Sequence, residues 1–372
     1  MKKLVTKSYP AAAHDYKEKL VPSSHGAAAY DFLATISTSM VLADRSKRDL
    51  RTLPKAHLHV HLEGAMRPET LAELSERHGL PEPLQPDGSF SRFIQLYRAA
   101  CEGLRAVDDL VRLVREVAED AAAAGAVWVE PATWLTPSAA ARVGVRDEEA
   151  MLEVLVDAAT RAARETHVGV GLMLSANRVQ PPTDAVGLAH LAARHAGRGV
   201  VAFGLADDET RAPPEPFAAA FGIARAAGLI SAPHAGEHGG PDSVRGALDA
   251  LGARRIEHGV RAAEEPALLD RLAAEEVCLD VCPTSNVQLH VVASYADHPL
   301  QTLLDAGVQV SLNADDPLFF GSGLLEEYEL ARHTFGLDDA ALARIAACSI
   351  RASGAPESVK VAAFANIEHW LA

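Results

Sequence analysis

The stretch HLHVHLEG, residues 57–64, sets three histidines two positions apart between apolar residues. Side chains two positions apart on a β-strand point to the same side, so His59 and His61 can face one metal ion together. An H-x-H pair alone is also compatible with chance or with a supporting role near a site. Its meaning therefore depends on what the rest of the chain places beside it.

Seven further short apolar runs follow this stretch, separated by longer segments with helical character. Several runs are nearly continuous in Val, Ile and Leu, as expected for strands buried on both faces. The intervening segments are rich in Ala, Leu, Arg and Glu, and most repeat their apolar positions at helical spacing. This alternation predicts an α/β fold, a parallel TIM (β/α)8 barrel with an outer ring of helices. The eight runs are residues 56–62, 126–134, 168–175, 200–205, 230–234, 255–260, 277–281 and 308–312.

Two segments are longer than simple crossovers require. Residues 67–107 predict additional helices that cover one mouth of the barrel, with Phe90, Phe93 and Tyr97 as an apolar face. Residues 324–370 predict further helices at the C-terminus, packed on the outside of the barrel.

The composition narrows the possible function classes. The chain has 372 residues, 48% of them hydrophobic, which is enough for a large buried core. Its formal net charge of −15 argues against binding to nucleic acid or to anionic lipid. No run reaches the roughly 18 apolar residues of a membrane span. The cysteines are widely spaced without a CxxC pair, which predicts reduced thiols and a cytoplasmic location; they are Cys101, Cys278, Cys282 and Cys348.

The first residues differ in composition from the remainder. Lysines crowd the start, whereas the rest of the chain uses arginine almost exclusively. We expect residues 1–39 to be a disordered leader or tag-like segment, and residues 40–372 to form a single barrel domain. The segment lacks the apolar core and cleavage site of a secretion signal.

Groups able to bind a metal occur at several strand ends, where barrels of this kind carry their active sites. The fifth run ends in HAGE (234–237), the sixth in EHG (257–259), and the eighth is followed by NADDP (313–317). Each has a plainer interpretation: His234 as a core histidine, Glu237 as a solvated carboxylate, Asp315-Asp316 as a turn. His258 could simply bond a carbonyl. Their joint placement at the ends of strands one, five, six and eight favours a metal site, and imidazoles with a carboxylate suit zinc.

These segments together resemble the adenosine/adenine deaminase family of metal-dependent hydrolases, in the amidohydrolase superfamily. The resemblance covers roughly residues 50–350, with the motifs in the family's order. They are LPKA (53–56) before the H-x-H pair, HAGE (234–237), RIEHG (255–259), CPTSN (282–286) and SLNADDP (311–317).

The resemblance implies a zinc ion held by His59, His61, His234 and Asp315. It also implies that Glu237 protonates the purine ring and that His258 acts on the attacking water. Asp316 would contact the substrate base. The reaction is hydrolytic deamination, which consumes water and releases ammonia without an organic cofactor.

Three departures from the family pattern bear on the substrate, a small purine nucleoside or base. Asp207 stands where adenosine-specific members carry a glycine, and the following Pro213-Pro214 pair is similar to adenine-specific members. Glu63 replaces an aspartate that commonly meets the ribose, and His57 replaces a glutamate. The SLNADD motif follows the adenosine type. We therefore expect adenosine or a 5′-modified adenosine first, with adenine or aminodeoxyfutalosine as the alternatives.

Two rival hypotheses remain. Amidohydrolases that act on esters or lactams often bridge two metals with a carboxylated lysine. Lys55 is the only lysine near the site and precedes the H-x-H pair, which favours a single zinc per chain. A non-catalytic purine-binding barrel would be favoured by loss of Glu237 or of a ligand, and all of these residues are present.

Overall fold

Eight parallel strands form the centre of the molecule and pair in the order in which they follow along the chain. The computed structural model describes residues 47–81 and 86–372, and the leader predicted for residues 1–39 lies outside them. The apolar runs form these strands because both of their faces are buried. The strands are β1 (Lys55–His61), β2 (Ala126–Thr133), β4 (Leu172–Asn177), β5 (Val200–Ala206), β6 (Ile230–Ala235), β7 (Arg255–His258), β8 (Cys278–Val281) and β9 (Gln309–Leu312).

The third predicted run is interrupted. A two-residue strand, β3 (Gly169–Val170), pairs with β2, and Gly171 separates it from β4. A larger residue at Gly171 would collide with an aromatic ring, because a Cβ there would lie 2.7 Å from the Trp128 side chain. The Trp128 ring thus leaves room only for glycine where the strand is interrupted.

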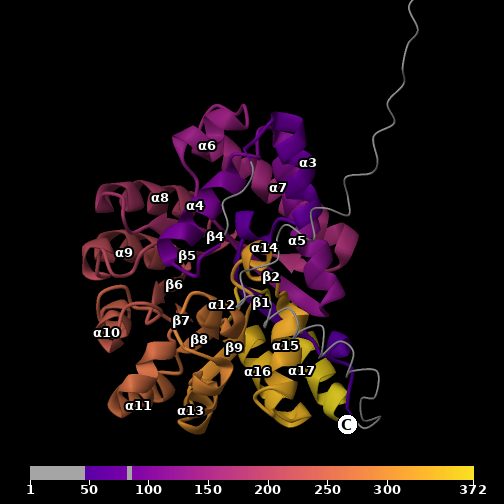
Figure 1. The fold of residues 1–372 in the computed structure, drawn as a ribbon, viewed down its shortest axis with the longest axis vertical. Coiled ribbons are helices and arrows are strands. Elements are labelled where there is room, and N and C mark those ends of the chain that lie inside the picture. Colours follow the sequence, from indigo (N-terminus) through magenta and orange to yellow (C-terminus); the bar gives the residue numbers. More distant parts are fainter. Residues whose placement is uncertain (1–46, 82–85) are drawn as a thin grey trace, which may run out of the picture.

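Helices surround the strands, as Figure 1 shows. The ring consists of α5 (Val107–Ala123), α7 (Glu148–Thr166), α8 (Pro182–Arg194), α9 (Ala218–Ala226), α10 (Pro241–Asp249), α11 (Pro266–Ala274), α13 (Leu300–Asp305) and α16 (Asp339–Ala352). The remaining α-helices are α3 (Pro68–His78), α4 (Phe90–Cys101), α6 (Pro137–Arg142), α12 (Pro283–Gln288), α14 (Pro317–Phe320), α15 (Leu324–His333) and α17 (Glu357–Leu371). Short 3-10 turns lie at Leu50–Thr52, Glu63–Ala65, Glu215–Phe217, Val260–Glu264 and Tyr295–Asp297.

This arrangement confirms the predicted TIM barrel. Within residues 47–81 and 86–372, no helix has the length and apolar character needed to cross a membrane.

Helix α4 carries the aromatic face expected over the barrel mouth. Phe93 packs against Phe319 and Phe320 of α14, with ring centroids 5.7 and 5.4 Å apart. Phe90, Phe93 and Tyr97 all line the cavity at this end of the barrel. The prediction for this segment is therefore confirmed.

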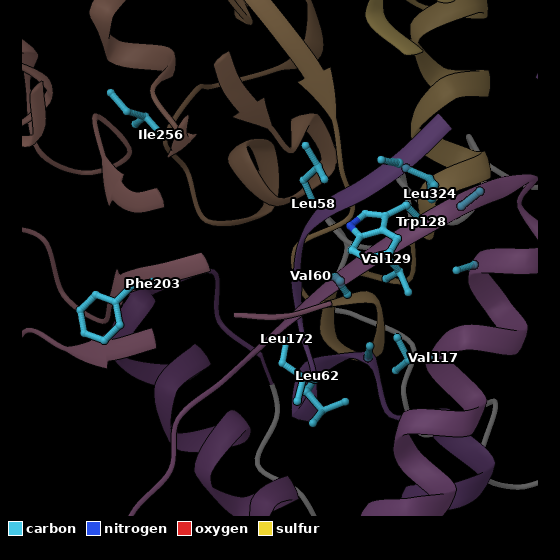
Figure 2. Packing of buried hydrophobic residues seen from close by; sticks show 14 of the residues in the cluster. Leu58, Val60, Leu62, Val117, Trp128, Val129, Leu172, Phe203, Ile256 and Leu324 are labelled. Carbon is cyan, nitrogen blue, oxygen red and sulfur yellow. The ribbon is translucent and has the colours of Figure 1, made fainter. Parts of the chain in front are cut away.

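The hydrophobic core lies between the strands and the ring of helices. Leu58 and Val60 of β1 and Leu62 just after it are buried in one large cluster that also includes Val117 of α5, as Figure 2 shows. The alternate residues of β1 are the histidines of the opening stretch, two of which are also fully buried or nearly so. One strand thus contributes apolar residues to the core and imidazoles to the inside of the barrel.

A narrow seam between β9 and β1 completes the ring. An isolated bridge joins Val60 to Asp315. The backbone amide of His61 donates to the Asp315 carbonyl at 2.9 Å, and the Asp315 amide donates to the His59 carbonyl at 3.1 Å. The side-chain oxygen of Asn313 accepts from the His59 amide at 3.0 Å. Residues proposed to bind metal therefore also close the barrel.

Candidate active site

The predicted site residues converge at the C-terminal ends of the strands. His59 and His61 come from β1, His234 from β6, His258 from β7, and Asp315 follows β9. A cavity of about 410 Å³ opens over them. Its wall includes the remaining predicted residues, namely Glu63, Asp207, Glu237 and Asp316.

The imidazoles and carboxylates are close enough to share a metal ion. Oδ1 of Asp315 lies 3.3 Å from Nε2 of His59 and 3.3 Å from Nε2 of His61. The ring centroid of His234 lies 4.9 Å from that of His59 and 5.3 Å from that of His61. His258 lies in the same cluster, since its ligand atoms group with those of His59, His234 and Asp315 within 4.8 Å. His61 groups with Asp315 and Asp316.

The chemistry of these residues fits a bound metal. Nδ1 of His59 lies 3.2 Å from the Asp280 carbonyl, and Nδ1 of His234 lies 3.1 Å from the Leu205 carbonyl. Each ring can donate through Nδ1 and keep Nε2 free as a ligand, which is the usual arrangement in metal sites. In the described part of the chain, Nε2 of His59 and Oδ1 of Asp315 are buried without a hydrogen-bond partner. A cation between them would satisfy both atoms.

Further polar residues orient this cluster. Ser285 of α12 donates to Oδ2 of Asp315 at 2.6 Å, which leaves Oδ1 facing the histidines. Oε2 of Glu257 lies 2.7 Å from Nδ1 of His234. Glu257 and Ser285 belong to motifs visible in the sequence, but the sequence does not show which residue each one contacts.

Glu237 has the environment of a proton donor. Its side chain is buried, and this burial, together with the negative charge of Asp315, raises the pKa of its carboxyl well above the ordinary value. Its Oε1 lies 3.6 Å from Nε2 of His258. Burial lowers the pKa of His258, so this imidazole is neutral near pH 7. A carboxyl with a raised pKa and a neutral imidazole therefore face the same cavity.

Asp316 lies beside His61 and Asp315 and packs against Gly64. A Cβ on residue 64 would lie 1.6 Å from Oδ1 of Asp316, so only glycine leaves room for the carboxylate. Burial raises the pKa of Asp316 well above its usual range. Oδ1 of Asp316 is buried with no partner among the described residues, and Asp316 lines the cavity, so it is available to a ligand.

Two of the three residues that depart from the family pattern, Glu63 and Asp207, are held by hydrogen bonds from their neighbours. Glu63 accepts hydrogen bonds from Tyr97 and Thr133, each at 2.8 Å. Asp207 has a positive φ of 80°, a conformation that suits the glycine usual at this position and that aspartate tolerates better than most residues. Its carboxylate accepts from Asn177 at 2.7 Å.

Sequence reasoning missed Glu209 and Arg178, which hold the loop that carries Glu237. The Glu209 carboxylate accepts from the backbone amides of Gly236, Glu237 and Gly239 at 2.5, 3.0 and 2.7 Å. Arg178 donates to the His234 carbonyl at 2.5 Å. The sequence shows an acid two residues after Asp207 but does not show that it contacts residues 236–239.

Lys55 lies at the other end of β1 from the site. Its ammonium donates to the carbonyls of Leu50 and Leu53 at 2.7 and 2.8 Å, and it is fully buried. Lys55 therefore lies away from the proposed metal ligands.

Comparison with known proteins adds to this geometry. The family model for adenosine deaminase matches residues 54–370. A Streptomyces virginiae protein, provisionally named as an adenosine/adenine deaminase, is 47% identical over 336 residues, covering 87% of this chain and 98% of its own. An aminodeoxyfutalosine deaminase of Streptomyces avermitilis is 35% identical, covering 87% and 94%.

Solved structures of similar fold give the same result. Adenine deaminase from Arthrobacter aurescens superimposes with a TM-score of 0.78 at 32% identity, covering 86% of this chain and 99% of its own. An amidohydrolase from Burkholderia ambifaria with bound zinc has a TM-score of 0.78 at 29% identity, covering 87% and 92%.

Proposed function

This chain belongs to the adenosine deaminase family and is a hydrolytic deaminase of the adenosine/adenine type, and we propose that it deaminates adenosine or a 5′-modified adenosine. The observation that carries the proposal is the convergence of Glu237, His258 and Asp316 around one group of metal-binding side chains. The products would be ammonia and the inosine-type nucleoside.

We propose one zinc ion per chain, held by His59, His61, His234 and Asp315. When bound there, zinc would polarise a water ligand and lower its pKa. The zinc-containing relative from Burkholderia ambifaria supports the choice of metal. The unpartnered atoms of His59 and Asp315 support the choice of ligands.

The chain's own residues account for the remaining chemistry. Water adds to the purine carbon that bears the amine, and the ring can accept the electrons once its neighbouring nitrogen is protonated. Glu237, with its raised pKa, holds the proton for that nitrogen. Asp316 offers a buried oxygen to the base. The exocyclic amine then leaves as ammonia, and a carbonyl replaces it.

The size of the cavity favours a nucleoside over a free base. Besides the groups that would contact the purine, the cavity is lined by residues such as Cys101, Arg142 and Met151, which would contact the rest of a larger ligand. Ligand cavities of this size bury most of a nucleoside-sized molecule. Adenine is the second candidate, favoured by the Pro213-Pro214 pair and by similarity to the Arthrobacter enzyme.

We also propose a cytoplasmic location. The four cysteines are all among the described residues and are free thiols, as in proteins of reducing compartments.

The decisive experiment measures ammonia release from adenosine, 2′-deoxyadenosine, adenine, methylthioadenosine and aminodeoxyfutalosine, alongside metal analysis. We expect the largest kcat/KM with a nucleoside and close to one zinc per chain. A preference for adenine would select the second candidate. Absence of turnover with all five compounds, in protein that contains zinc, would refute adenine-directed deamination.

A further inference from the structure

A chain of buried hydrogen bonds runs from the backbone of α13 to His258. The Leu300 amide donates to Nδ1 of His298 at 3.1 Å. Nε2 of His298 lies 3.2 Å from Oδ1 of Asn286, and Nδ2 of Asn286 lies 3.1 Å from Nδ1 of His258. The side chains of His298, Asn286 and His258 are all buried, with residue exposures of 6%, 0% and 1%.

The direction of every bond in this chain follows from its first member. A backbone amide can only donate, so Nδ1 of His298 is an acceptor and carries no proton. The neutral ring then carries its proton on Nε2 and donates to the oxygen of Asn286. Burial lowers the pKa of His298 to about 4, which agrees with a neutral ring at pH 7.

The orientation of the Asn286 amide determines which nitrogen of His258 carries the proton. Its oxygen is engaged by His298, so its NH2 group faces His258. An amide NH2 can only donate, and Nδ1 of His258 must therefore accept. A neutral imidazole that accepts at Nδ1 carries its proton on Nε2, the nitrogen that faces Glu237 at 3.6 Å.

We propose that Asn286 and His298 are positioning residues that fix His258 as the Nε2–H tautomer, so that His258 donates a hydrogen bond into the cavity. This inference rests on the proposed function for the role of His258. In this tautomer Nε2 has no lone pair with which to accept a proton. His258 therefore acts by orienting water and by stabilising negative charge on oxygen.

The backbone at His258 shows that its orientation is tightly determined. His258 has a φ of 66° and the following Gly259 a φ of 73°, both in the left-handed region. A histidine keeps such a conformation only where its surroundings hold it. The hydrogen bond from Asn286 is one of these constraints.

Asn286→Asp is the sharpest test, because it exchanges donor and acceptor in the hydrogen bond to His258 with almost no change in side-chain volume. A carboxylate only accepts, so it can still accept from Nε2 of His298 but now requires a proton on Nδ1 of His258. The matched control is Gln288→Glu, which adds a carboxylate to the same helix, where Gln288 contacts the Phe320 carbonyl and not His258.

The first readout is nitrogen NMR of zinc-loaded protein labelled with 15N-histidine. The chain has 16 histidines, and comparison with His258→Gln assigns the signals of His258. We expect a protonated Nε2 in the wild type and a protonated Nδ1 in Asn286→Asp. A wild-type His258 protonated on Nδ1 would overturn the inference, and this result does not depend on any substrate.

The second readout is steady-state kinetics. Asn286→Asp should lose about 10²-fold or more in kcat, the typical effect of removing one donor to a developing negative charge. Its KM and zinc content should stay near wild type, as should the kcat of Gln288→Glu. Near-normal kcat in Asn286→Asp would contradict the proposal.

A second pair of variants covers the case in which Asn286→Asp does not fold. His298→Gln keeps a nitrogen donor toward Asn286 and should retain most activity, whereas His298→Leu removes it and should show a mixture of His258 tautomers. Equal kcat and equal spectra for these two variants would also overturn the inference. If no adenine compound is deaminated, the spectra still decide the tautomer, so the two proposals fail separately.

Discussion

At the scale of single residues, the site shifts the pKa values of two buried carboxyl groups, Glu237 and Asp315, in opposite directions. Burial, together with the negative charges of Asp315 and Glu209, raises the pKa of the Glu237 carboxyl. Asp315 faces His59 and His61, and although burial opposes ionisation, these imidazoles hold its pKa well below the usual range. One acid is therefore suited to carry a proton and the other to bind a cation.

Glu237→Gln tests this division. The amide has the same shape but cannot deliver a proton, so kcat should fall by about 10² to 10⁴ while zinc content is unchanged. Ammonia release and metal analysis of the same preparation measure both. Glu264→Gln, at a partly exposed glutamate that pairs with Arg261, is the control for the chemical change. A Glu237→Gln enzyme with near-normal turnover would remove Glu237 from the acid role.

At the scale of elements, the loop after β6 is held by a carboxylate that is not itself part of the cavity wall. Glu209 follows β5 and accepts from three backbone amides of residues 236–239. The loop carries Glu237, and Gly236 within it has a φ of 71°. The position of the proposed acid is therefore set by a residue in the loop that follows the neighbouring strand.

Glu209→Gln should weaken this arrangement, since an amide presents one acceptor oxygen where the carboxylate presents two. We expect a loss of roughly 1–3 kcal/mol in the free energy of unfolding and a reduced kcat. The control is Asp109→Asn, because Asp109 is a buried carboxylate that accepts from the Arg105 and Ala106 amides, each at 2.9 Å, outside the site. It should lose stability without losing kcat in the folded enzyme. Equal kcat in the two variants would refute a special role for Glu209.

Lys55, at the start of β1, should make the free energy of unfolding depend on pH. Burial lowers the pKa of Lys55 to about 7, although Asp49 and Glu329 oppose this change. In the unfolded chain a lysine keeps a pKa near 10.4, so between these values the unfolded state binds more protons. The free energy of unfolding should therefore rise with pH across this range.

Lys55→Met removes the titrating group and keeps a chain of similar length. Between pH 7.5 and 9.5, the stability of the wild type relative to this variant should increase by roughly 1 kcal/mol for each pH unit. Denaturant unfolding at several pH values measures the difference. A difference that stays constant or decreases over this range would show that Lys55 is not a buried group with a lowered pKa.

Most elements could be predicted because parallel buried strands read as continuous apolar runs. The break at Gly171 could not, since it depends on the Trp128 ring packing from another strand. The proposed site residues could be located by their motifs, and the structure brings them together, whereas the contacts of Glu209 and His298 could not be predicted. Glu209 contacts residues 27 to 30 positions away in the sequence, and His298 contacts Asn286, 12 positions away. No local sequence pattern encodes contacts at these separations.

At the scale of the whole molecule, the proposed metal ligands lie on both sides of the seam between β1 and β9. His59 and His61 belong to one strand and Asp315 follows the other. A metal bound to all three would hold the two ends of the sheet together, and any ligand that binds only the folded state stabilises it.

Removal of the metal by a chelator should therefore lower the unfolding temperature by several degrees and loosen this seam first. Hydrogen exchange should increase in β1 and β9 more than in the continuously paired β4 and β5. Added zinc should reverse both effects. Uniform exchange across all strands after metal removal would contradict a link between the metal and closure of the barrel.

The same seam has a consequence for how the protein is made. Asn313 accepts from the Leu58 amide, a contact that spans 255 residues of chain. During synthesis β1 leaves the ribosome long before its partner, so the early sheet has an open edge and incomplete metal ligation. Such edges invite pairing with other chains. Translation that stalls before Asn313 would therefore leave His59 and His61 on an unclosed sheet, a product for chaperones or proteases to remove.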